Sequence, residues 1–226
     1  MQRDVQQIGL RVSDTTSVSA LLSRPEQPRA CLVLAHGAGA GMTHPFLEDV
    51  ANGLSERGVA TLRYQFPYMD KGGKRPDPPA VAHAAVRAAV REAARCCPGL
   101  PLFAGGKSFG ARMTSQAQAK LPLAGIRGLV FLGFPLHPSG NPSSDRADHL
   151  VDVRIPMLFV QGTRDKLAEP DLLKPVVDRL GAVATPQWIE GADHSFHVPA
   201  RSGRNDRAVM IEILDSVAGW IEKNRT

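Results

Sequence analysis

The chain has 226 residues, of which 43% are hydrophobic, a content that predicts one α/β domain over residues 1–226 with a sizeable core. Its formal net charge of +5 comes from basic residues that are not clustered, so no nucleic-acid partner is expected. The apolar runs are too short to span a membrane, and residues 1–4 lack the apolar core of a secretory signal, which predicts a cytoplasmic protein. The cysteines Cys31, Cys96 and Cys97 match neither a disulfide framework nor a metal-ligand spacing.

The order of apolar patterns along the chain predicts alternating strands and helices. Residues 7–13 and 17–22 alternate apolar and polar side chains around a short turn, which predicts a hairpin at a sheet edge. Continuous apolar runs then predict strands of a mostly parallel sheet that is buried on both faces, at 31–35, 59–62, 102–104, 129–132 and 157–160. Helices on both faces are expected at 45–57, 79–97, 108–120, 170–181 and 206–223. The loops 71–79 and 138–145 are too short for a cap domain, so an open site is expected.

A glycine-rich run at 36–41 follows the strand 31–35 and precedes a predicted helix. Such a loop is typical of the oxyanion loops of lipases and esterases, whose backbone N–H groups face the developing negative charge. The expected donors are the N–H groups of Ala38 and of Phe109. Gly39 is an alternative to Ala38, because a sequence does not define the geometry of a loop.

The segment 102–110 is an apolar strand that runs through Gly106, Ser108 and Gly110 into a helix. The pattern G-x-S-x-G in this position predicts a nucleophile elbow, in which a strained strand-to-helix turn lifts the serine hydroxyl clear of the sheet. The same letters end a phosphate-binding pattern, but Pro101 stands where that pattern needs its first glycine. Proline offers no N–H and no positive φ, which argues against nucleotide binding.

A serine hydroxyl is a poor nucleophile at neutral pH and needs a histidine base and an orienting carboxylate. Asp165 follows the strand 157–160 in a loop, and His194 follows a further predicted strand near 185–189. The order Ser108, Asp165, His194 is that of the α/β-hydrolase arrangement. His197 is the remaining alternative for the base, and Asp193 is the alternative for the acid.

With these elements in place, the chain resembles the α/β-hydrolase superfamily from about residue 7 to residue 223. Within it, the chain is most similar to small dienelactone-hydrolase-like proteins, and more narrowly to bacterial relatives of the testis-expressed and NSL-complex-subunit-like hydrolases. The matching segments are HGAGAGMTHPF (36–46), RYQFPYM (63–69), GGKSFGAR (105–112), GFPLHPSGNP (133–142) and FVQGTRD (159–165). The chain departs from dienelactone hydrolases proper because Ser108 stands where they use cysteine.

The sequence therefore predicts a serine hydrolase of the carboxylesterase or thioesterase type, acting on an acyl bond of a small-molecule substrate. No cofactor and no metal are implied. Residues 137–149 are expected to border the acyl or leaving-group pocket, and the basic loop with Lys71, Lys74 and Arg75 is a candidate for attracting anionic substrates. The alternative is a non-catalytic scaffold that binds a ligand or a protein partner, which fold analogy by itself does not exclude.

Overall fold

The computed structural model describes residues 4–225. Of residues 1–4, on which the prediction about a secretory signal rests, residues 1–3 lie outside the described part. Its centre is one eight-stranded sheet with the order β1-β2-β4-β3-β5-β6-β7-β8. The hairpin β1–β2 is antiparallel, β2 pairs antiparallel with β4, and every other pairing is parallel. The strands are β1 Asp4–Arg11, β2 Ser17–Arg24, β3 Ala30–Ala35, β4 Val59–Tyr64, β5 Leu102–Lys107, β6 Ile126–Leu132, β7 Met157–Gly162 and β8 Ala184–Ile189.

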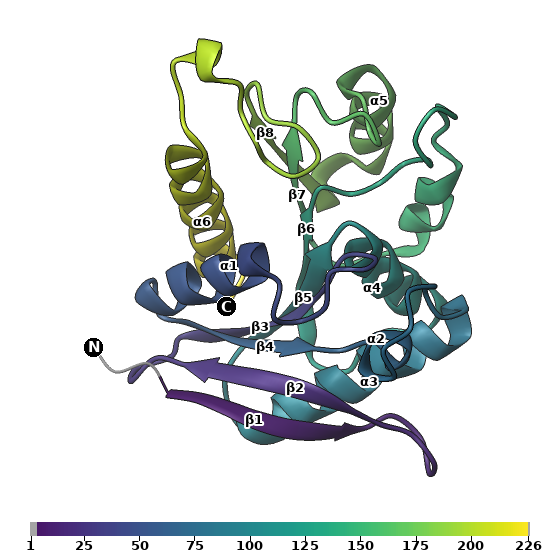
Figure 1. Cartoon of the computed structure of the whole chain (residues 1–226), viewed down its shortest axis with the longest axis vertical. Helices are drawn as coiled ribbons and strands as arrows, with labels where there is room; N and C mark the ends of the chain where they lie inside the picture. The colour runs from purple at the N-terminus through teal and green to yellow at the C-terminus, as the bar shows by residue number, and fades with distance from the viewer. Residues whose placement is uncertain (1–3, 226) are drawn as a thin grey trace.

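Helices cover both faces of this sheet, as Figure 1 shows. α1 and α6 pack against each other on one face, whereas α3, α4 and α5 line the other. The helices are α1 Pro45–Glu56, α2 Pro67–Asp70, α3 Pro79–Cys96, α4 Phe109–Lys120, α5 Pro170–Leu180 and α6 Asp206–Lys223. The 3-10 helices are η1 Asp145–Asp152, η2 Gly181–Val183 and η3 Ala200–Ser202. The predicted α/β-hydrolase sheet with helices on both faces is confirmed.

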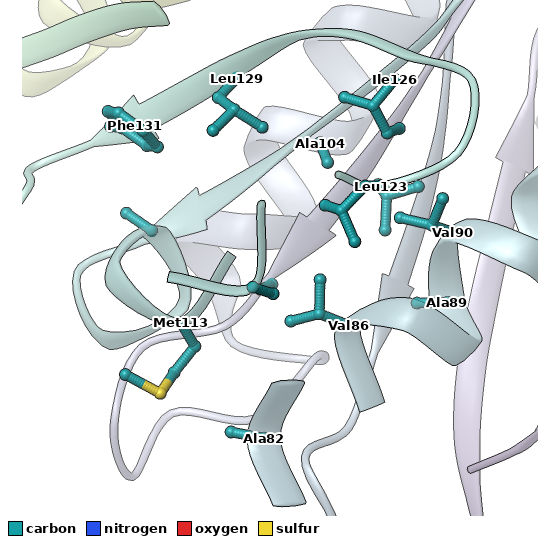
Figure 2. Packing of buried hydrophobic residues seen from close by; sticks show 14 of the residues in the cluster. Ala82, Val86, Ala89, Val90, Ala104, Met113, Leu123, Ile126, Leu129 and Phe131 are labelled. Carbon is teal, nitrogen blue, oxygen red and sulfur yellow. The ribbon is translucent and has the colours of Figure 1, made fainter. Parts of the chain in front are cut away.

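The core consists of two layers of buried apolar side chains, one on each face of the sheet. Figure 2 shows part of the larger layer, where Val86 of α3 points toward Leu123 and the strands β5 and β6. The facing positions of α3 are alanines and valines, and these small side chains let the helix approach the sheet closely. In the central strands β3 and β4 every residue is buried, as their apolar runs predicted.

Most predicted elements agree with the structure to within three residues, and the differences are local. β5 continues past the apolar run through Gly105, Gly106 and Lys107. The short elements α2 and η1 were not predicted, because they depend on contacts with other segments rather than on apolar periodicity. η1 packs against α4. No helix among the described residues is long and apolar enough to cross a membrane.

Two glycines let β3, β5 and α4 meet at a single point. A Cβ atom at Gly106 would lie 2.4 Å from the carbonyl oxygen of Ala35, and a Cβ atom at Gly110 would lie 2.6 Å from the same oxygen. Real Cβ atoms do not approach a backbone oxygen so closely, so any larger residue forces the strand and the helix apart. The elbow between β5 and α4 therefore depends on the glycines at both ends of the G-x-S-x-G pattern.

Replacing Gly110 by alanine should destabilise the protein although alanine is the better helix former. We expect the free energy of unfolding to fall by about 1–3 kcal/mol, because the new methyl group collides with the backbone of Ala35. The matched control is Gly219→Ala in α6, where a Cβ meets nothing within 4 Å. That change should stabilise the protein by about 0.5–1 kcal/mol. Urea unfolding of both variants tests the expectation, and equal effects in the two helices would contradict it.

Candidate active site

Ser108 lies at the turn between β5 and α4 with a backbone φ of 51°. This left-handed conformation is strained for a residue with a side chain, and here it is imposed by the close packing of the elbow. The Oγ atom of Ser108 lies 2.9 Å from Nε2 of His194. The strained turn thus presents the hydroxyl to the histidine, as the G-x-S-x-G pattern predicts.

His194 is carried by the loop that follows β8, and its ring links the other two residues. Its Nδ1 lies 2.7 Å from Oδ2 of Asp165, while its Nε2 faces Ser108. In the tautomer with the proton on Nδ1, the ring donates a hydrogen bond to the Asp165 carboxylate, and Nε2 accepts one from the hydroxyl of Ser108. A quarter of the His194 side chain remains exposed to solvent (25%), so the site is open, as the short loops predict.

Asp165 is buried at the end of the turn that follows β7. Besides His194, it accepts hydrogen bonds from Nε2 of Gln161 at 2.5 Å and from the backbone N–H of Leu167 at 2.8 Å. Gln161 in turn accepts the N–H of Phe134 at 2.9 Å. These bonds hold the carboxylate in one orientation and tie the turn to the loop after β6.

Asp193 and His197, the alternatives for the acid and the base, have other hydrogen-bond partners. The Oδ1 atom of Asp193 accepts the backbone N–H groups of Ser195 and His197, which makes it a turn residue. His197 is exposed and pairs through Nδ1 with Asp206 at 2.8 Å, which raises its pKa. The structure therefore brings together Ser108 and His194 with Asp165, and places His197 in a surface ion pair.

The glycine-rich loop after β3 lies directly beside the elbow. A Cβ at Gly37 would lie 3.8 Å from Cβ of Ser108. The N–H of Gly39 donates to the hydroxyl of Tyr68 at 3.0 Å and is thereby occupied. The N–H groups of Ala38 and Phe109 have no acceptor within residues 4–225. Of the two loop residues considered, Ala38 is thus the one with an N–H free to bind an oxyanion.

His36 holds the start of this loop from inside the core. Its Nδ1 lies 2.7 Å from the carbonyl oxygen of Gly37, and its Nε2 accepts the N–H of Phe66 at 3.0 Å. Burial lowers the pKa of His36 to about 4, so the ring is neutral at physiological pH with the proton on Nδ1. A neutral ring that donates on one side and accepts on the other links the glycine-rich loop to the loop after β4.

Lys107, the residue before the nucleophile, holds the loop that carries His194. Its Nζ donates to the carbonyl oxygen of His194 at 2.5 Å. The ammonium lies 5.2 Å from the ring centroid of Phe196 and 6.0 Å from that of Phe46, and these two rings are stacked. Burial lowers the pKa of Lys107 to about 8, although the carboxylates of Asp165 and Asp193 partly oppose this shift.

Two cavities meet at Ser108, and Ala38 and Leu167 also line both of them. The first, of about 340 Å³, is lined by His194 and Lys107 and extends toward α1. The second, of about 460 Å³, extends along α4 to η1 and the loop after β6. The second cavity includes part of the segment 137–149 that the sequence placed beside the substrate pocket. Within residues 4–225, no group of three acidic, histidine or cysteine side chains is arranged to hold a metal ion.

Three residues that the sequence analysis did not single out have clear structural roles around the site: His36, Lys107 and Gln161. His36 begins the glycine-rich loop, Lys107 precedes Ser108, and Gln161 lies in the same segment as Asp165. Each stands at or next to the end of a strand. Their positions in the sequence carried a weak signal, because a polar residue at the end of a buried strand needs a hydrogen-bond partner. The identity of those partners depends on how the loops meet.

In the loop 71–79, the basic side chains of Lys71, Lys74 and Arg75 line neither cavity. The residues of the same loop that do line the second cavity are Pro76, Asp77 and Pro79. Its three basic side chains thus stand outside both cavities.

Residues 28–222 match the family described as alpha/beta hydrolase domain, and the chain belongs to that family. Over the full length of both chains, the structure is similar to a dienelactone hydrolase from Anabaena variabilis, with 18% identity and a TM-score of 0.78. A serine hydrolase without lid from Xanthomonas campestris is similar over 97% of this chain and 96% of its own, with 18% identity and a TM-score of 0.75. The esterase domain of a Rhodothermus marinus protein matches over the full length of both, with 13% identity and a TM-score of 0.73. These similarities confirm the α/β-hydrolase fold and its dienelactone-hydrolase-like form.

The lowered pKa of Lys107 predicts how the free energy of unfolding changes with pH. The unfolded chain keeps the ordinary lysine value of 10.5, so between about pH 8 and pH 10 it binds more protons than the folded protein does. The contribution of Lys107 to the free energy of unfolding therefore rises with pH over this window. We expect the stability difference between the natural protein and Lys107→Met to shift in favour of the natural protein from pH 8 to pH 10.

Urea unfolding at pH 7, 8.5 and 10 measures this difference. The control is Lys120→Met, an exposed lysine at the end of α4. The natural protein and this control should respond alike to pH. A difference between the natural protein and Lys107→Met that stays constant over the same range would contradict the expected burial of the ammonium.

Proposed function

We propose that the protein is a serine hydrolase that cleaves an ester, thioester or similar acyl bond of a small substrate through an acyl-enzyme intermediate. The observation that carries the proposal is the continuous hydrogen-bonded chain from Ser108 through His194 to Asp165, with separations of 2.9 Å and 2.7 Å. This arrangement has the geometry that general-base activation of a hydroxyl needs. Membership of the alpha/beta hydrolase family supports the same chemistry.

In the proposed mechanism, Oγ of Ser108 attacks the acyl carbon while Nε2 of His194 takes the hydroxyl proton. The negative oxygen of the tetrahedral intermediate is stabilised by the N–H groups of Ala38 and Phe109. Asp165 holds the imidazole in the required tautomer and stabilises the imidazolium that forms. His194 then gives its proton to the leaving group, and the acyl group stays on Ser108.

Water completes the cycle by the same route. His194 takes a proton from the water as it attacks the acyl carbon, and returns that proton to Oγ of Ser108 as the acid leaves. Only groups of this chain and the two substrates take part in these steps.

Labelling with a fluorophosphonate probe, read by mass spectrometry, tests the proposal. We expect one label per molecule on Ser108 of the folded protein, and none on Ser108→Ala or on a heat-denatured sample. On any ester that the protein cleaves, Ser108→Ala should lower turnover by about 10⁴- to 10⁶-fold. A folded, unlabelled natural protein would contradict the hydrolase proposal and favour a binding scaffold.

A matched pair of histidine variants tests the assignment of the base. We expect His194→Ala to slow labelling of Ser108 by at least about 10³-fold, because the hydroxyl loses its proton acceptor. His197→Ala removes only the exposed pair with Asp206, so its labelling rate should stay that of the natural protein. The opposite pattern would assign the base to His197.

A further inference from the structure

The cavity along α4 is lined by two arginines that form no ion pair with a carboxylate in the described part of the chain. Arg112 lies one helical turn beyond Ser108, about 6 Å along the axis, and Arg146 extends from η1. Within residues 4–225, neither guanidinium lies within ion-pair distance of an acidic side chain. The Nε atom of Arg112 is buried and has no hydrogen-bond partner. A buried donor on a cation is costly to leave unpaired, so its retention needs an explanation.

Two other polar side chains of this cavity, Asp77 and His137, already have hydrogen-bond partners. Oδ2 of Asp77 accepts the N–H of Tyr68 at 2.9 Å, and Nε2 of His137 pairs with Glu169 at 2.7 Å. Burial and the positive charge of Arg146 both lower the pKa of Arg112. The two guanidinium groups therefore repel each other across the cavity, and a bound anion would relieve that repulsion.

The position of His194 assigns the two parts of a substrate to the two cavities. His194 must deliver a proton to the leaving group, so the leaving group belongs in the cavity that His194 lines. The acyl portion then extends into the cavity lined by Phe109, Arg112 and Arg146. This assignment rests on the hydrolase function proposed above.

We propose that the cavity along α4 binds an acyl portion that ends in a carboxylate, and that Arg112 and Arg146 together bind this carboxylate. The substrates are then half-esters or half-thioesters of dicarboxylic acids. Guanidinium groups suit this role, because their planar N–H donors match the two oxygens of a carboxylate. The cavity of about 460 Å³ has room for a short acyl chain of this kind.

A pair of esters with the same leaving group measures this preference. One is 4-nitrophenyl hydrogen adipate, whose acyl chain ends in a carboxylate, and the other is the neutral 4-nitrophenyl hexanoate. After subtraction of the spontaneous rates, we expect kcat/KM of the natural protein to favour the adipate by at least about 10-fold. High salt should reduce that preference, because ions screen the attraction of partly exposed charges.

Three variants locate the preference. Arg112→Met and Arg146→Met should each lower the ratio of the two kcat/KM values by about 10- to 100-fold, since each removes a charge-assisted hydrogen bond. The control Arg91→Met removes an exposed arginine of α3 outside the cavity and should keep the ratio of the natural protein. A ratio near 1 in the natural protein, or one that both cavity variants leave unchanged, overturns the proposal.

A binding measurement separates this proposal from the hydrolase function itself. Calorimetry on Ser108→Ala compares monomethyl adipate with neutral dimethyl adipate, and the monoanion should bind at least about 10-fold more tightly. Adding Arg146→Met should remove that difference. Equal binding of the two compounds overturns the carboxylate site even where the fluorophosphonate probe labels Ser108. Absence of labelling with preferential binding of the monoanion overturns the hydrolase function and retains the anion site.

Discussion

The contact of β3, β5 and α4 around Ala35 supports everything else at the site. Gly106 and Gly110 both face the carbonyl oxygen of Ala35, and no Cβ fits at either position. Because strand and helix are held so close, the chain between them turns within a few residues, and Ser108 adopts a φ of 51°. The strain at one residue is small beside the packing of the sheet around it, so the nucleophile elbow is held rigidly.

Around this rigid elbow, three loops are fixed by polar side chains at the ends of buried strands. His36 links the glycine-rich loop after β3 to the loop after β4, and Gln161 orients Asp165 and binds the loop after β6. Lys107 holds the carbonyl group of His194, and its ammonium lies beside two stacked rings. The hydrogen bonds of His36 and Gln161 are buried, where a lost partner costs more than at the surface. The positions of the loops therefore depend on one another.

The two cavities that meet at Ser108 are lined by different polar side chains. On one side His194 contacts the buried carboxylate of Asp165. On the other side Arg112 and Arg146 present cationic groups without acidic partners in the described part of the chain. The basic loop at 71–75, which charge composition pointed to, stands outside both cavities.

The sequence by itself determined the order of strands and helices and the order of Ser108, Asp165 and His194, because apolar periodicity and the G-x-S-x-G turn are local properties of the chain. Which loop N–H stays free, where Asp193 and His197 point, and how α2 and η1 form were decided only by tertiary structure. The same is true of the two unpaired arginines, which lie more than thirty residues apart in sequence and meet only when η1 packs on α4. Such features depend on which segments come together in space, and no local pattern of residues encodes that.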